Sequence, residues 1–216
     1  MSQLASRLAR RIVEEDGAFR TRMLSLAAGM KDVIALGRGD PDFHTPAHIV
    51  AAAKAAIDAN HHHYTGPTGL PALRAAIAAD LKAAHGLDYG GDEIVVTAGA
   101  QEGIMLAMLG LCTPGDEVLI TSPRFTTYDT AVRLCGGVPV PVPTHEKDNF
   151  ALDVAEIAVR ISPRTRMFVL TTPNNPTGAV TPPAVIRAIA DLALQHDLLI
   201  IADEIYARMI YAPNQH

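Results

Sequence analysis

Tryptophan is absent from this 216-residue chain, aromatic residues make up only 5% of it, and it has two cysteines. A small secreted domain held together by disulfides needs more cysteines. We therefore interpret Cys112 and Cys135, both in apolar segments, as buried, reduced thiols of a cytoplasmic protein. No window approaches 18 uninterrupted apolar residues, so no segment is predicted to span a membrane. The early arginines are not followed by an apolar stretch, which argues against a secretory signal.

A basic surface is lacking as well. The formal net charge is −5, so neither nucleic acid nor an anionic membrane is an expected partner. A metal site is not predicted, because His61, His62 and His63 have no further ligand at zinc spacing and a solvated or packed loop explains them more simply. Asp40 and Asp42 could pair for acid–base chemistry, but capping of a turn is the simpler interpretation. Hydrophobic residues, at 49%, are ample for a buried core.

The order of the periodic segments predicts an α/β fold. Before residue 91 the pattern is helical, with helices expected at 48–59 and 70–84. After it, apolar runs typical of strands alternate with helical segments. Strands are expected at 94–97, 117–121, 138–142, 166–172 and 198–206, and helices at 100–112, 125–137, 153–161 and 182–197. This alternation predicts a three-layer α/β/α architecture with a mainly parallel sheet.

In such a sheet, ligands bind at the carboxyl ends of the strands, so the residues just after each strand are candidates for chemistry. Gly99, Ala100 and Gln101 form a small-residue turn that opens into a helix. Backbone N–H groups and the helix dipole favour an anion such as a phosphate there, although an ordinary tight turn explains the same residues. Phe125, beyond the next strand, could lie flat on a planar ring or pack in the core.

Two further strand ends carry polar residues. Residues 173–178, PNNPTG, predict a rigid turn in which an amide can donate a hydrogen bond to an oxyanion, but an ordinary turn needs some of the same residues. Asp203 follows an apolar run, and burying its carboxylate is unfavourable without a cation or hydrogen-bond donors. A metal ion or a protonated ring nitrogen would each be a partner, although no set of residues at metal-ligand spacing accompanies Asp203.

Five segments together resemble the aspartate-aminotransferase-like family of fold-type-I pyridoxal-phosphate enzymes. Their order and spacing carry the resemblance, which runs from about Val33 to the end of the sequence. They are LGRGDPDFHTP, HHYTGPTGLPALR, VVTAGAQEGI, TTPNNPTGAV and IADEIY. The resemblance implies the large cofactor-binding domain of that fold. Residues 1–45 would be an N-terminal arm with part of the small domain, and residues 46–216 an incomplete large domain.

The resemblance also implies how pyridoxal 5'-phosphate would be bound. The turn Gly99-Ala100-Gln101 would bind its phosphate through backbone N–H groups, and Phe125 would stack on its ring. Asn175 and Tyr206 would hydrogen-bond the phenolic oxygen of the ring. Asp203 would pair with the pyridinium nitrogen and so keep the ring protonated.

Substrate and subunit contacts follow from the same resemblance. Gly39 would lie near the substrate carboxylate, and Tyr64 would reach the phosphate bound by the partner subunit of a homodimer. Two positions depart from the pattern of the family. Phe125 stands where many relatives carry tryptophan or tyrosine, so stacking is kept but polar contacts are lost. Gln101 stands where relatives often have lysine, which removes a charge near the phosphate but no backbone donor.

The Schiff-base lysine of the family is expected beyond His216, because no lysine of this chain follows a suitable strand; the lysines are Lys31, Lys54, Lys82 and Lys147. No catalytic residue is therefore expected within the chain, and the chain alone is expected to be inactive. For the complete enzyme, the resemblance implies transamination between an amino acid and a 2-oxo acid. A lyase or decarboxylase on the same fold, and a non-catalytic fragment that binds the cofactor or dimerises, stay open as alternatives.

Overall fold

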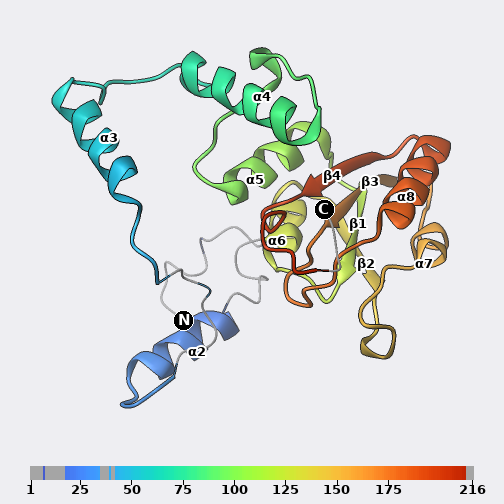
Figure 1. Cartoon of the computed structure of the whole chain (residues 1–216). Helices are drawn as coiled ribbons and strands as arrows, with labels where there is room; N and C mark the ends of the chain where they lie inside the picture. Colours follow the sequence, from blue (N-terminus) through green and yellow to red (C-terminus); the bar gives the residue numbers. More distant parts are fainter. Residues whose placement is uncertain (1–6, 8–17, 35–38, 40–41, 213–216) are drawn as a thin grey trace. The chain divides into compact units, whose positions relative to one another are not determined.

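The structure is a computed structural model that describes residues 7, 18–34, 39 and 42–212. The chain divides into two compact units, a helical one within Glu14–Thr97 and a sheet-containing one that includes Ala98–His216 (Figure 1). The division into residues 1–45 and 46–216 that the resemblance implies stays a prediction. Among the described helices, none is long and apolar enough to cross a membrane.

The first unit consists of helices. They are α2 (Ala18–Ala28), α3 (Ala47–Asp58), α4 (Pro71–His85) and the 3-10 helix η2 (Gly91–Glu93). Helices α3 and α4 confirm the two helices predicted from alanine-rich periodic segments. Proline fits the first turn of a helix because the N–H it lacks would have no intrahelical acceptor, and α4 begins with Pro71. The same helix ends at Gly86, whose φ of +70° is a conformation that glycine adopts readily.

One predicted strand is wrong. Residues 94–97 form no strand, and the N–H of Val96 instead donates to the carbonyl oxygen of Thr68 over 3.1 Å. The Arg74 guanidinium fixes the same loop, because it donates to the carbonyl oxygen of Gly91 over 2.7 Å and also to the Thr68 hydroxyl. A short apolar run becomes a strand only if a neighbouring strand accepts its backbone hydrogen bonds, and here loop contacts accept them.

A four-stranded parallel sheet forms the centre of the second unit, with the order β2-β1-β3-β4. Each strand coincides to within a few residues with a predicted one. They are β1 (Glu117–Ser122), β2 (Val138–Pro143), β3 (Thr165–Thr171) and β4 (Leu199–Asp203). The prediction of a mainly parallel sheet is therefore confirmed. β4 is shorter than predicted, because the chain turns at residues 205–208.

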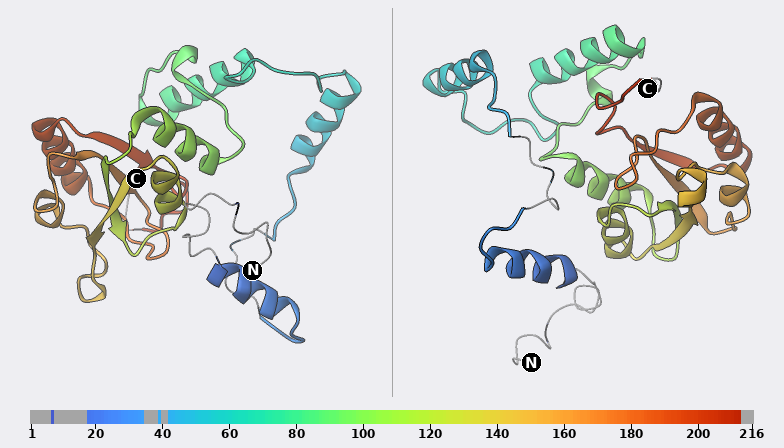
Figure 2. Two further views of the ribbon diagram at one scale, coloured as in Figure 1. Left: turned by 180° about the vertical axis from the view of Figure 1, so that it is seen from behind. Right: turned by 60° about the horizontal axis from the view of Figure 1, so that its bottom comes forward.

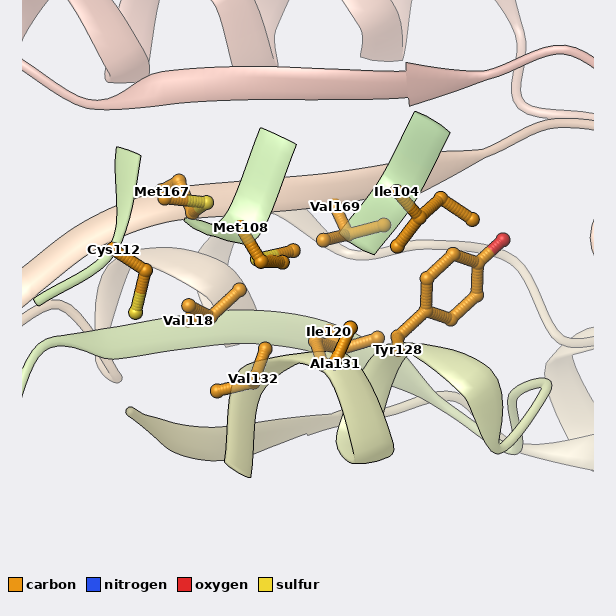
Figure 3. Close-up of a cluster of buried hydrophobic side chains, with 10 residues drawn as sticks. All are labelled: Ile104, Met108, Cys112, Val118, Ile120, Tyr128, Ala131, Val132, Met167 and Val169. Carbon is orange, nitrogen blue, oxygen red and sulfur yellow. The ribbon is translucent and has the colours of Figure 1, made fainter. Parts of the chain in front are cut away.

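Helices cover both faces of this sheet (Figures 1 and 2). They are α5 (Ala100–Leu111), α6 (Thr127–Leu134), α7 (Val154–Ala158) and α8 (Pro183–His196), and a 3-10 helix, η3 (Glu146–Asp148), follows β2. Because side chains alternate along a strand, β1 serves two cores: Val118 and Ile120 join the cluster under α5 and α6, and Leu119 joins the one under α7 and α8. Figure 3 shows the first cluster. Burying each such side chain stabilises the fold by about 1.5–3 kcal/mol.

Candidate functional site

The carboxyl ends of β1, β3 and β4 meet at one edge of the sheet. Thr171, the last residue of β3, is in register with Asp203, the last residue of β4. Asn174, in the turn after β3, donates from its side-chain amide to the hydroxyl of Thr121 on β1 over 3.3 Å. The polar residues predicted after β3 and after β4 therefore lie at a common edge, beside the end of β1.

Asp203 is half-buried there and accepts two hydrogen bonds, one on each carboxylate oxygen. Its Oδ2 accepts from the Tyr128 hydroxyl over 2.7 Å, and its Oδ1 accepts from the backbone N–H of Ile205 over 3.1 Å. Among the described residues, no group of three or more histidine, cysteine or acidic side chains could hold a metal ion. The sequence predicts that this carboxylate needs a cation or hydrogen-bond donors, and these two donors meet part of that need.

Tyr128 is a site residue that the sequence reasoning missed. It lies in the first turn of α6, only 2% of its surface is exposed, and its hydroxyl oxygen accepts from Thr171 Oγ1 over 2.9 Å. Burial raises the pKa of the Tyr128 hydroxyl well above its usual value, and the contact with Asp203 raises this pKa further, so the phenol stays protonated. The helical spacing from Phe125 would have placed Tyr128 on the buried face of α6, but no sequence signal points to Asp203.

Asn175 and Tyr206, assigned to the same ring oxygen from the sequence, do lie together. The Asn175 Nδ2 donates to the Tyr206 hydroxyl over 3.1 Å, and both side chains are half-buried. The turn around them is fixed by Asn174, whose backbone N–H donates to the carbonyl oxygen of Ala179 over 2.9 Å and whose side-chain oxygen accepts from the Thr177 hydroxyl over 3.0 Å. The turn predicted for PNNPTG is thereby confirmed.

The turn before α5 has the backbone that the phosphate prediction needs. Gly99 precedes the helix with φ +84°, and the position that a Cβ would take has no atom within 4 Å. This conformation favours glycine and leaves room for a ligand to approach the backbone. The carboxylate of Glu102 accepts from the N–H of Ala98. The positive end of the helix attracts this carboxylate and favours a phosphate for the same reason.

A hollow of about 360 Å³ joins this turn to the carboxylate. Its lining includes Ala100, Gly103 and Ile104 of α5 on one side, and Asp203 with Ile205 on the other. Two of the predicted cofactor residues, Ala100 at the start of α5 and Asp203 at the end of β4, therefore line the same cavity.

Phe125 is partly buried and packs against the core cluster that contains Tyr128. Phe125 thus makes core contacts, which is one of the two interpretations that the sequence left open. Its stacking on a cofactor ring, and the binding of a phosphate by Gln101, stay predictions.

Two predicted residues belong to the helical unit. The side chain of Tyr64 is fully exposed and Gly39 is exposed, and their roles toward the partner subunit and the substrate stay predictions. The histidine run is exposed too, and His62 lies 3.3 Å from the side-chain oxygen of Asn60, which agrees with the interpretation of a solvated loop. Of the acidic pair near Gly39, Asp42 is exposed and Asp40 lies outside the described residues.

The donors and acceptors at this edge suit pyridoxal 5'-phosphate in chemical type. A helix N-terminus preceded by an open glycine suits a phosphate dianion. A carboxylate whose orientation is fixed suits a protonated ring nitrogen, and an amide beside a phenol suits an ionised ring oxygen.

Comparison with known proteins finds relatives that are aminotransferases. The chain matches the family described as aminotransferase class I and II over residues 31–216. The aspartate aminotransferase of Pyrococcus abyssi is 42% identical over 196 residues, which are 90% of this chain and 50% of that protein. Aromatic-amino-acid aminotransferase 2 of Thermococcus litoralis is 41% identical over 191 residues, which are 88% of this chain and 49% of that protein.

A solved structure extends the similarity to the fold. N-succinyldiaminopimelate aminotransferase from Mycobacterium tuberculosis superposes with a TM-score of 0.91 at 34% identity, covering 97% of this chain and 55% of that chain. The predicted fold class is thereby confirmed. The chain spans about half the length of the curated relatives it matches.

Proposed function

We propose, on the premise that this chain belongs to the aminotransferase class I and II family, that it forms the cofactor-binding part of an aminotransferase. Such an enzyme moves an amino group between an amino acid and a 2-oxo acid with pyridoxal 5'-phosphate. The observation that carries the proposal is Asp203: its carboxylate is fixed at the end of β4 by Tyr128 and lines the same hollow as the start of α5.

Each part of the site has a task in this proposal. The backbone of residues 99–101 binds the phosphate, and Phe125 covers one face of the ring. Asn175 and Tyr206 donate hydrogen bonds to the phenolic oxygen and keep it ionised. Asp203 holds a proton on the ring nitrogen, because an ionised carboxylate stabilises the adjacent positive charge. When bound, the cofactor supplies an electron sink for the carbanion at the substrate's alpha carbon.

Three further features complete the proposal. The enzyme is a homodimer in which Tyr64 reaches the phosphate bound by the partner subunit, and Gly39 contacts the substrate carboxylate. Its location is the cytoplasm, which is supported by two unpaired thiols, Cys112 and Cys135. The relatives are named for different amino acids, aspartate and aromatic amino acids among them, so the proposal names the substrate class and no single amino acid.

The test is cofactor binding by the 216-residue chain, measured as a dissociation constant from the absorbance of pyridoxal 5'-phosphate. Asp203→Asn keeps the shape of the side chain and removes its charge. A hydrogen bond to a charged group contributes about 1.5–3 kcal/mol, so binding should weaken about 10- to 150-fold. Asp197→Asn, at an exposed helix end, is the matched control and should bind as the unmodified chain does. Unchanged binding by Asp203→Asn would contradict the proposal.

The reaction itself is tested in the full-length enzyme. Amino acids are offered with a 2-oxo acid, and the new 2-oxo acid is measured beside ammonia and carbon dioxide. Transamination yields the new 2-oxo acid together with the amino acid formed from the added 2-oxo acid, without ammonia or carbon dioxide. Release of ammonia or carbon dioxide instead would assign the scaffold to a lyase or a decarboxylase.

A further inference from the structure

We infer that Tyr128 is a positioning residue: its hydroxyl sets the orientation of the Asp203 carboxylate toward the ring nitrogen of a bound pyridine ring. This inference deepens the proposed function and rests on it, since it concerns the carboxylate that the proposal assigns to that nitrogen. It assigns a task to a side chain that lies 75 residues from Asp203 in the sequence.

Tyr128 is buried in the core. Its ring is part of the core cluster with Ile104, Ile120 and Val169, and Figure 3 shows its hydroxyl oxygen at the edge of that cluster. Phenylalanine would pack the same ring without burying a polar group. Burying a hydroxyl is unfavourable unless its hydrogen bonds are made, so the contacts of this oxygen call for an explanation.

The Tyr128 hydroxyl donates one hydrogen bond and accepts another. An ionised carboxylate can only accept, so the single proton of the Tyr128 hydroxyl is donated to Asp203 Oδ2. The lone pair of the same oxygen accepts from the hydroxyl of Thr171, which is 5% exposed. With its acceptor site filled by Thr171, the Tyr128 hydroxyl has one stable orientation, and that orientation points its proton at Asp203.

The Asp203 carboxylate is held at both of its oxygens. One oxygen of the carboxylate is held by Tyr128 over 2.7 Å and the other by the N–H of Ile205 over 3.1 Å, so rotation of the carboxylate plane is restrained at both oxygens. Each oxygen keeps a second lone pair for another donor. The other tyrosine at this edge has a different partner, because Tyr206 accepts from Asn175. The hydrogen bonds of the Tyr128 hydroxyl thus join it to Asp203 and Thr171, whereas the Tyr206 hydroxyl is bonded to Asn175.

A pair of ligands separates positioning from packing. Pyridoxal 5'-phosphate has the ring nitrogen, and its carbocyclic analogue carries a C–H group in that place. We expect Tyr128→Phe to weaken binding of pyridoxal 5'-phosphate by roughly tenfold, the effect of one lost hydrogen bond, and binding of the analogue by less than about twofold. Dissociation constants are measured by titration of the 216-residue chain. Tyr211→Phe, at an exposed side chain, is the control and should change neither.

Two further measurements guard against a variant that fails to fold. Thr171→Val removes only the donor to the Tyr128 oxygen, and it should weaken pyridoxal 5'-phosphate selectively by roughly two- to fivefold. In the ligand-free chain, urea unfolding of Tyr128→Phe, Asp203→Asn and the double variant measures the coupling of the two residues. A coupling of zero would overturn the inference whatever the ligands do.

The outcomes also separate this inference from the proposed function. Equal losses for both ligands in Tyr128→Phe would make Tyr128 a structural residue and overturn the inference alone, as would no loss for either. If the unmodified chain binds neither ligand, or if Asp203→Asn binds pyridoxal 5'-phosphate normally, the proposed function fails and the inference fails with it.

Discussion

Acidification should weaken the sheet through one buried carboxylate, Glu117, at the start of β1. Its side chain is 9% exposed and accepts from the Ser162 hydroxyl over 2.6 Å and from the Arg164 Nε over 3.0 Å. These donors lie in the segment that leads into β3, so Glu117 joins the beginnings of two central strands. The Ser162 hydroxyl and, less strongly, Arg164 hold the pKa of the Glu117 carboxyl below its usual 4.5, against the opposite effect of burial.

The size of the effect follows from these contacts. Hydrogen bonds to a charged acceptor contribute about 1.5–3 kcal/mol each to the free energy of unfolding. Arg164 is 71% exposed, so solvent screens most of the contribution of its interaction with Glu117. Glu117→Gln should therefore lower the free energy of unfolding by about 2–3 kcal/mol at about pH 7. The NH2 group of the glutamine would face a donor, Ser162 or Arg164, in the place of a carboxylate oxygen that accepts a hydrogen bond from it.

The pH dependence has a definite sign. A carboxyl whose pKa is lowered by folding stabilises the folded state above its unfolded pKa, and this stability is lost as the pH falls through the folded pKa. The difference between the unmodified chain and Glu117→Gln should thus be complete at neutral pH and shrink progressively below about pH 4.5.

Urea unfolding followed by circular dichroism measures this difference. Glu156→Gln is the matched control, because Glu156 pairs with Arg160 one helical turn away, is 40% exposed, and should contribute under about 0.5 kcal/mol. A Glu117→Gln difference that is negligible at neutral pH, or that stays constant on acidification, would refute the reasoning.

Three other predictions concern the core and its thiols. Gly137→Ala should lower the free energy of unfolding in urea by about 1–3 kcal/mol, because the new Cβ would stand 2.7 Å from Cys112 Sγ; Gly110→Ala, in open space on α5, should not destabilise the chain. Phe168→Ala, at a side chain that is 1% exposed, should cost about 3–5 kcal/mol by the same assay, and a loss below about 1 kcal/mol would contradict its place in the core. Since burial raises the pKa of the Cys112 and Cys135 thiols, both should react with iodoacetamide more slowly at neutral pH than after unfolding in urea, and equal rates would argue against it.

Periodicity predicted most of the second unit because its signals are local. The apolar runs of β1 and β3 and the proline at which α8 begins can all be seen within a short window of sequence. The failure at residues 94–97 has the opposite cause. Whether an apolar run becomes a strand depends on which backbone groups lie beside it, and here Thr68 lies beside Val96.

The candidate site divides in the same way. Asp203 stood out in the sequence because a carboxylate after an apolar run needs a partner, and Asn175 with Tyr206 stood out through resemblance. Tyr128 did not, because a tyrosine in a helix is usually part of a core, and nothing local distinguishes one whose hydroxyl meets a carboxylate.

The sequence by itself determined the α/β class, the family, and which strand ends carry polar groups, since periodicity and residue spacing are properties of neighbouring residues. The tertiary structure decided what those groups contact. It brought Tyr128 to Asp203 across 75 positions of the chain and Thr171 to Tyr128 across 43, and it placed the start of α5 on the same hollow as Asp203. The physical reason is that hydrogen bonds act over about 3 Å, and only the packing of helices on a sheet determines which distant residues come that close.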